Sequence, residues 1–348
     1  MKKVLFATTA LVATAGVAAA DVTLSGSAEM GIVGGDAYTG RGADGIIGSA
    51  DDTTGVTQFH TDIDVTFTLS GSTDNGLTFG ASFDLDEADG SAGIGPSGPD
   101  GSVFLSGNFG TITMGDTDGA FDWAMNEVPA GPGSINDAET THGGFNGNAG
   151  FDEFFRGTDA EGHILRYDHS VGALAFAVSI EIDDESFTVA PAPSDTDPVI
   201  GLGVRYDLNL GGADMEIALG YQTTGVTVGA VSADPSIIGL SIDTTVSGLN
   251  IGLNYSVVDW DTAALSDTTH VGIGVGYSMD AISFGLNWGR FDDLGGVAGD
   301  ESSGFGLSAG YDLGGGASVL FGYSTTDMTI GGVNADSNIW SLGLSMSF

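Results

Sequence analysis

The chain contains no cysteine, and its only lysines, Lys2 and Lys3, lie at the extreme N-terminus. Without a thiol, the protein has no disulfide, no cysteine zinc site and no thiol nucleophile. Without a lysine in the rest of the chain, it has no Schiff-base lysine and no phosphate-binding P-loop. Beyond the N-terminus the basic side chains are those of Arg41, Arg156, Arg166, Arg205 and Arg290.

Basic charge is scarce throughout, because 7 Lys and Arg residues stand against 47 Asp and Glu residues and the formal net charge is −40. So negative a field repels phosphate backbones, which excludes nucleic-acid binding. Hydrophobic residues nevertheless make up 41% of the chain, and 59 residues are glycine. The composition is too acidic for a bundle of membrane helices and too apolar for a disordered chain.

Only one long hydrophobic run is present, at the N-terminus. The two lysines are followed by VLFATTALVATAGVA and then by alanines up to residue 20. This pattern predicts a cleaved signal peptide over residues 1–20, so the mature chain is exported. A retained membrane helix is the less favoured alternative, because the run is short and ends in small residues. If the mature chain crosses a membrane, it does so as a barrel.

Apolar and polar side chains alternate along many short segments. In residues 57–70, TQFHTDIDVTFTLS, one face is apolar and the other polar, as in a strand between lipid and water. Continued along the chain, the pattern predicts strands over 22–33, 57–70, 77–88, 102–108, 110–116, 162–170, 173–183, 198–208, 215–222, 236–244, 249–258, 268–278, 281–290, 303–313, 317–325 and 338–348. We therefore predict an all-β fold, a 16-stranded antiparallel transmembrane β-barrel over residues 21–348.

The connections and the aromatic residues agree with this fold. Short turns, such as 211–213 and 314–316, alternate with long acidic segments, such as 34–56 and 184–197. Tyrosines cluster toward both ends of the strands and indicate two aromatic girdles, although aromatic residues also simply favour strands. The last segment, IWSLGLSMSF, alternates strictly and ends on Phe348, which resembles the signal read by the outer-membrane barrel-assembly machinery.

Three stretches resemble the general diffusion porins of Gram-negative bacteria, in particular the alphaproteobacterial (Rhodobacter-type) porins. They are VTLSGSAEMGI, FTLSGSTDNGLTFGASF and GSVFLSGNFGTITMGDTDGA. The resemblance implies a homotrimer in the outer membrane, surrounded by lipid and lipopolysaccharide, that passes small hydrophilic solutes and needs no cofactor. It also implies that the third long loop folds inward and narrows the pore.

The corresponding loop here is residues 117–161, the longest segment without strand alternation. Structureless stretches of this length are usually functional or disordered. From pattern alone a flexible surface loop remains an alternative, whereas the resemblance implies a pore-constricting loop. Its candidate constriction residues are Asp118, Asp122, Glu127, Asp137, Glu139 and Arg156.

The family pattern also implies a cluster of basic side chains on the wall opposite this loop. At the corresponding place the chain presents His60, Asp62 and Asp64, so the basic cluster is missing. The other candidates on inward faces are Arg166 with Asp168, and Arg205 with Asp207. Arg41 lies in the first long loop, and Arg290 has the outward parity.

With so few basic residues, we predict cation selectivity, since carboxylates around a pore attract cations. The alternative is that most carboxylates lie in outer loops, where salt screens them. In the first long loop Asp36, Asp44, Asp51 and Asp52 are candidate Ca²⁺ ligands, although an acidic solvated loop explains them equally well.

Other classes of protein are less well supported. The five histidines lack metal-ligand spacing and no G-x-S-x-G motif is present, so we predict that the chain is not an enzyme. A secreted acidic Ca²⁺-binding β-protein, of the adhesin or surface-layer type, stays open, but it would bury its apolar faces in a core. A solute-specific channel is the closer alternative.

Overall fold

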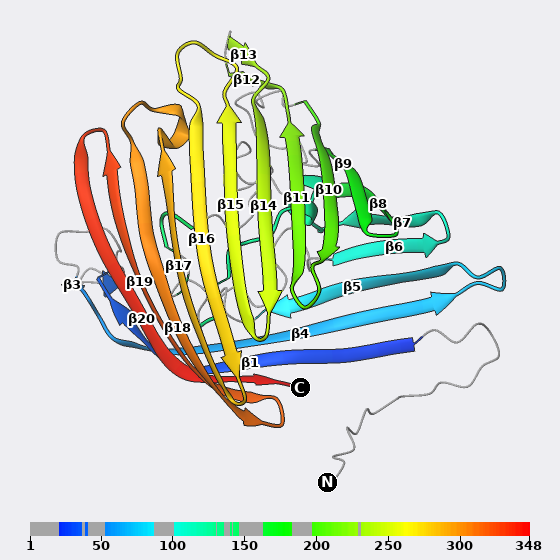
Figure 1. Cartoon of the computed structure of the whole chain (residues 1–348), viewed down its shortest axis with the longest axis horizontal. Coiled ribbons are helices and arrows are strands. Elements are labelled where there is room, and N and C mark those ends of the chain that lie inside the picture. Colours follow the sequence, from blue (N-terminus) through cyan, green and yellow to red (C-terminus); the bar gives the residue numbers. More distant parts are fainter. Residues whose placement is uncertain are drawn as a thin grey trace.

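The computed structural model describes residues 21–36, 39–40, 53–86, 101–129, 131–135, 140, 142–145, 163–182, 197–228 and 231–348. In this part of the chain a closed antiparallel barrel of sixteen strands dominates (Figure 1). Its strands are β1 (Asp21–Gly35), β4 (Gln58–Ser72), β5 (Thr78–Asp86), β6 (Gly101–Gly107), β7 (Gly110–Gly115), β8 (His163–Val171), β9 (Leu174–Ile182), β10 (Val199–Asn209), β11 (Asp214–Thr223), β14 (Ser236–Val246), β15 (Leu249–Asp259), β16 (Thr268–Met279), β17 (Ile282–Asp292), β18 (Glu301–Gly314), β19 (Ala317–Ile330) and β20 (Val333–Ser347).

Barrel strands that are consecutive along the chain pair with each other. The first strand, β1, closes the sheet because it pairs with both β4 and β20. Ser27 of β1 lies opposite Asp64 of β4 on one side and opposite Ser347 of β20 on the other. The predicted fold and each of the predicted strands are confirmed. The largest error in the predicted strand bounds is at the β19–β20 hairpin. The predicted strands leave residues 326–337 as a connection, whereas the hairpin extends to a two-residue turn at Gly331 and Gly332. Polar pairs such as Asp327 and Asp336 continue its ladder beyond the apolar alternation.

Smaller elements lie in the connections. Two short hairpins are formed by β2 (Thr39–Gly40) with β3 (Thr53–Thr54) and by β12 (Val226–Val228) with β13 (Val231–Ala233). Helix α1 (Ala120–Ala124) follows β7, and the 3-10 helix η2 (Leu294–Gly296) precedes β18. No helix in the described ranges is long and apolar enough to cross a membrane.

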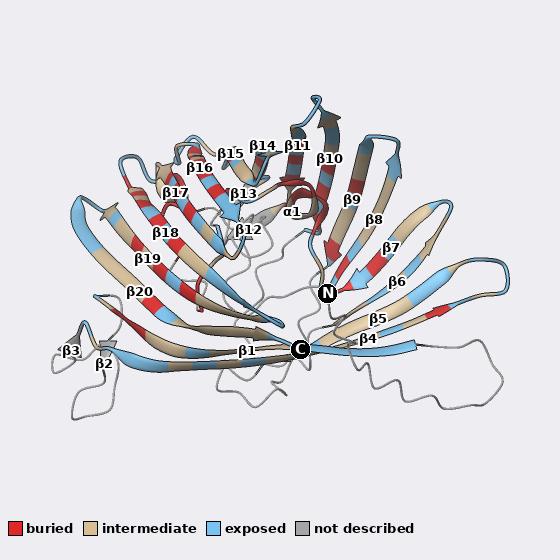
Figure 2. Ribbon diagram, turned by 60° about the horizontal axis from the view of Figure 1, so that its bottom comes forward, coloured by how far each residue is buried: buried red, intermediate tan, exposed pale blue. Residues whose placement is uncertain are grey.

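In this barrel the apolar side chains of the strands are exposed and the polar side chains are buried, which is the reverse of a water-soluble protein. On β15 the outward side chains of Ile251, Leu253 and Tyr255 are 41%, 39% and 45% exposed, whereas Asn254 is 1% exposed. Figure 2 shows the same alternation of exposed and buried residues along β14 to β18. The apolar face therefore points away from the barrel and the polar face points into it, which is the opposite of what a secreted β-protein with a buried apolar core requires.

The buried residues lie between the inner wall and the first part of the 117–161 segment. Phe121 and Met125 pack with Ile237, and Ile135 packs with Val33 and Leu320. The wall beneath them is lined with glycine, and a Cβ added at Gly220 would lie 2.6 Å from the ring of Phe121. Glycine is thus required where a second layer of chain lies directly on the strands.

Gly203 of β10 provides a test of this contact, because an added Cβ would overlap the carbonyl oxygen of Ala120 in α1. We expect Gly203→Ala to destabilise the docked segment by ~1–3 kcal/mol, as other overpacked sites are destabilised. Gly276→Ala is the matched control, since its nearest neighbour would be the Cβ of Pro129 at 3.6 Å. Chymotryptic cleavage after Phe121 or Trp123 of the folded protein measures the effect, and equal cleavage of both variants would contradict the prediction.

Candidate functional site

The first part of the 117–161 segment crosses the inner wall from β9 to β15. The backbone N–H of Ala120, at the start of α1, donates to Ser179 Oγ of β9 at 2.8 Å. Helix α1 then packs on β10 and β11, and Figure 2 places it on the concave side of these strands. Asn126 hydrogen-bonds to β11, β14 and β15.

Residues 129 and 131–135 continue in the same direction around the barrel. An added Cβ at Gly274 of β16 would lie 2.5 Å from the oxygen of Pro129, and one at Gly310 of β18 would lie 2.8 Å from Pro132. Ile135 reaches the glycines of β1 and β20 that face into the barrel. The described part of the segment therefore follows the polar face of the wall from β9 to β1.

Residues 140 and 142–145 are anchored on β16 to β19. Asn287 Nδ2 of β17 donates to the oxygen of Thr140 at 3.2 Å, and Gly143 N donates to Thr326 Oγ1 at 2.9 Å. Nε2 of the buried His270 lies 2.9 Å from the oxygen of Gly144. These contacts fix the backbone of the segment at a second place.

His142 organises this second anchor. Its Nδ1 accepts a hydrogen bond from Gly144 N at 3.1 Å, so the neutral ring carries its proton on Nε2 and donates to Asn287 Oδ1, 3.1 Å away. Burial lowers the pKa of His142 to about 4; the hydrogen bond to Asn287 opposes this shift and the nearby His270 adds to it. Protonation would turn Nδ1 from an acceptor into a donor facing another donor.

Arg166 and Asp168, both on β8, come together with Asp118 at the start of the segment. Arg166 Nη1 donates to the backbone oxygen of Asp118 at 2.7 Å and lies 3.8 Å from its carboxylate. Arg166 Nε lies 3.5 Å from Asp168 Oδ1, and the arginine side chain is only 11% exposed. The guanidinium thus ties the segment to the wall between two carboxylates.

Arg205 and Asp207, the other predicted pair, lie on β10 in different surroundings. The guanidinium of Arg205 lies 3.9 Å from the centre of the Trp123 ring. Asp207 lies opposite Glu216 of β11, which in turn lies opposite Asp243 of β14. Three carboxylates therefore form a row across adjacent strands.

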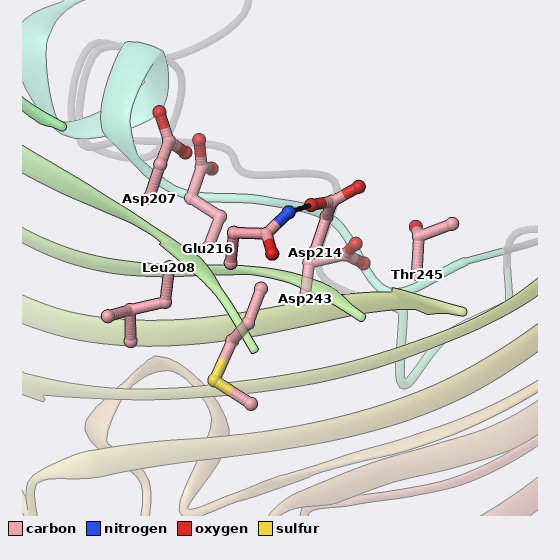
Figure 3. Close-up of a pocket in the computed structure, with 8 residues that line it drawn as sticks. Asp207, Leu208, Asp214, Glu216, Asp243 and Thr245 are labelled. Atoms are coloured by element: carbon pink, nitrogen blue, oxygen red, sulfur yellow. Dashed lines mark hydrogen bonds between the residues drawn. The ribbon is translucent and has the colours of Figure 1, made fainter. Parts of the chain in front are cut away.

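This row lines a cavity of about 360 Å³ near the short turns. Figure 3 shows Asp207 and Glu216 pointing to one side of the sheet and Leu208 to the other. Glu216 and Asp243 are not among the residues predicted from the sequence, although strand alternation places both on the inward face.

A second acidic group lies on β1 and β4. His60 Nε2 is 3.8 Å from Glu29 Oε2, and Ser27 Oγ donates to Asp64 Oδ2 at 2.9 Å. Asp62 lies opposite Glu29 in the register. This wall presents carboxylates and one histidine.

The remaining predicted residues are separate from these groups. Asp122 is part of α1, Glu127 is exposed just after it, and Arg290 lies on the outer face beside Asp292 and Glu301. The carboxylate of Asp36 accepts a hydrogen bond from Asn338. In the part of the chain that the structure describes, no group of three metal-ligating side chains could hold a metal ion. Asp137, Glu139, Arg156, Arg41, Asp44, Asp51 and Asp52 lie outside the described residues.

The second anchor should weaken in acid. Since the pKa of His142 falls from 6.5 to about 4 on folding, its contribution to docking is complete above pH 6.5 and is lost as the pH falls toward 4. We expect the opening equilibrium around Gly144 to rise about tenfold per pH unit in this range. Amide hydrogen exchange, corrected for the intrinsic rate, measures it. His142→Gln removes this titrating group and should reduce the slope; equal slopes in both proteins would refute the role of His142.

Comparison with known proteins gives a consistent result. A family model described as Gram-negative porin matches residues 7–331. A porin of Rhodobacter capsulatus is 29% identical over 369 aligned residues, which cover 94% of this chain and 100% of the relative. A porin structure refined at 1.8 Å resolution is 25% identical with a TM-score of 0.66 and covers 94% of this chain and 100% of its own. An anion-selective porin from Comamonas acidovorans is 15% identical with a TM-score of 0.63, and covers 95% of this chain and 100% of its own.

The family match extends over most of the chain and agrees with the closed barrel and its exposed apolar face. Porins are passive channels and carry out no chemical reaction. The chain therefore belongs to the Gram-negative porin family, and it is an outer-membrane channel rather than an enzyme.

Proposed function

We propose that the protein is a cation-selective porin for small hydrophilic solutes and ions, and that the 117–161 segment narrows its pore. The observation that carries this proposal is the charge of the inner wall. Carboxylates face the lumen in two groups, the row on β10, β11 and β14 and the group on β1 and β4. The arginines Arg166 and Arg205 are both engaged, one between two carboxylates and one over an indole ring.

The sign of the selectivity follows from this balance. Carboxylates around a water-filled pore raise the local concentration of cations and oppose anions. The guanidinium of Arg166 is compensated by Asp118 and Asp168, so it adds little to an anion-attracting field. The anion-selective relative shares the fold, hence the fold leaves the sign open and the wall residues must determine it.

The proposal includes the maturation and assembly of the chain. Residues 1–20 act as the signal peptide, and the mature protein begins at Asp21. The final strand offers Phe348 to the assembly machinery, which is supported by its position beside Gly26 of β1 and its 80% exposure. Three copies assemble in the outer membrane, surrounded by lipopolysaccharide. Divalent cations bridge the acidic loops of the protein to the phosphates of the lipopolysaccharide.

Calcium binding in the first long loop is part of the same proposal. Of the four predicted calcium ligands, Asp36 lies in the part of the chain that the structure describes. Its carboxylate lies at the long-loop end of β1 beside Asn338. Asp44, Asp51 and Asp52 supply the other carboxylates.

Conductance in a planar bilayer tests the function directly. We expect the purified protein to insert in steps of three channels and the zero-current potential across a KCl gradient to have the sign of a cation-selective pore. Weak or anion selectivity would place the effective carboxylates outside the pore and refute the charge argument. The absence of any conductance from folded protein would contradict the channel itself.

A double variant tests which carboxylates matter. Asp207→Asn with Asp243→Asn removes two charges from the wall row and leaves Glu216 in place. A charge about 4 Å from a permeating ion contributes ~1 kcal/mol in water, so we expect loss of the two charges to lower the permeability ratio of K⁺ to Cl⁻ by roughly 30-fold. The control is Asp280→Asn, in the turn between β16 and β17, where asparagine tolerates the left-handed backbone (φ 53°). An equal effect of the control would assign the selectivity to the general charge of the protein.

A further inference from the structure

Asn126 hydrogen-bonds to the wall through its backbone N–H, its backbone oxygen and its side chain. Its backbone N–H donates to Ser241 Oγ of β14 at 3.0 Å, and its backbone oxygen accepts from Asn254 Nδ2 of β15 at 2.9 Å. Its side-chain Nδ2 donates to the carboxylate of Glu216 on β11. One residue thus engages three adjacent strands through three different groups.

We propose that Asn126 is the positioning residue that holds the first part of the 117–161 segment against the wall and thereby sets the width of the pore. This inference rests on the proposed role of that segment in narrowing the lumen. We call the side-chain hydrogen bond between Asn126 and Glu216 the latch.

The apolar contacts beside Asn126 cannot fix this position alone. Phe121 and Met125 lie on Gly220 and Gly239, and burial of apolar surface is non-directional. The glycines under these two side chains have no side chain to interlock with, and the apolar wall residues that pack with them are Ile237 and Val258. Directional hydrogen bonds must therefore determine where along the strands the segment rests.

The wall partners also depend on Asn126. Ser241 and Asn254 are each 1% exposed, so moving the segment away from them without allowing water to enter would leave buried polar groups without these hydrogen bonds. Glu216 is flanked by Asp207 and Asp243, and the amide of Asn126 is a donor in this row of like charges. Hydrogen bonds to ionised acceptors are stronger than those between neutral groups.

The chemistry of the pair allows positioning to be separated from charge. Glu216→Gln keeps an acceptor oxygen for Asn126 while removing the negative charge. Asn126→Asp keeps the size of the side chain but sets a carboxylate against a carboxylate. In the double variant the amide at position 216 can donate a hydrogen bond to the carboxylate at position 126, so the direction of the bond is reversed. The total charge of the double variant equals that of the original protein.

Single-channel recording of these three variants is the experiment. We expect Asn126→Asp to populate a wider, noisier conductance level roughly 10- to 100-fold more often, as loss of a hydrogen bond to a charged group implies. Glu216→Gln should keep the original conductance level and lose part of its cation preference. The double variant should return both properties to the original values. Failure of the double variant to restore the original level would overturn the latch.

A cross-link separates failure of the latch from failure of the proposed function. The chain has no cysteine, and a Cβ built at Gly276 lies 3.6 Å from the Cβ of Pro129, within the 3.5–4.5 Å range of disulfides. Pro129→Cys with Gly276→Cys, added to Asn126→Asp, should give the original conductance level when oxidised and the wider level when reduced. The oxidised state also demonstrates that the variant folds.

The outcomes of the cross-link experiment distinguish failure of the latch from failure of the proposed function. If the disulfide does not form when Pro129→Cys and Gly276→Cys are placed in the protein that keeps Asn126, the segment does not lie on the wall, and both the latch and the proposed constriction fail. If the disulfide forms but Asn126→Asp alone conducts like the original protein, the latch is wrong and the proposed function stands. If reduction leaves the conductance of the cross-linked Asn126→Asp variant unchanged, Asn126 does not set the width of the pore.

Discussion

Closure of the sheet at β1 is the constraint on which the rest of the structure depends. β1 pairs with β4 along one side and with β20 along the other, so no strand of the barrel presents a free edge. A membrane offers no water to satisfy an open edge, hence only a closed sheet can cross it. Closure also creates an inside and an outside, and side-chain alternation then assigns each residue to lipid or lumen. A slip of one residue in the β1–β4 register would exchange the two faces.

Closure alone leaves a wide lumen, and the glycines of the wall allow the chain to fill part of it. Gly203, Gly220, Gly252 and Gly274 each present a bare backbone where residues 120–129 cross β10, β11, β15 and β16. The high glycine content noted in the sequence thus has a structural cause beyond turns. Without side chains on the wall, the segment approaches to backbone contact, and polar groups such as Ser179 and Asn254 lie close enough to hydrogen-bond it.

The sequence predicted the barrel well because the relevant signal is local and periodic. Alternation along each strand located the strands, and it failed mainly at the β19–β20 hairpin, where backbone pairing continues through polar residues. Docking of the 117–161 segment has no such signal. Asn126 and Glu216 are 90 positions apart, and His142 and Asn287 are 145 apart, so only the closed barrel brings them together. Glycines recurring on the inward parity were the one readable clue to a close approach.

The acidic wall is costly to fold and useful in function, and the architecture explains how both hold. Like charges directly opposite on neighbouring strands are destabilising, as in the row of Asp207, Glu216 and Asp243. In a water-filled lumen the repulsion between two such charges is about 1 kcal/mol at 4 Å, far below its value in a dry interior. Amide donors reduce it further, since Asn126 binds Glu216 and Asn209 binds Asp214. The stability of the barrel comes from its closed ladder and outer face, so its inner face is free to carry the carboxylates to which we attribute the proposed cation selectivity.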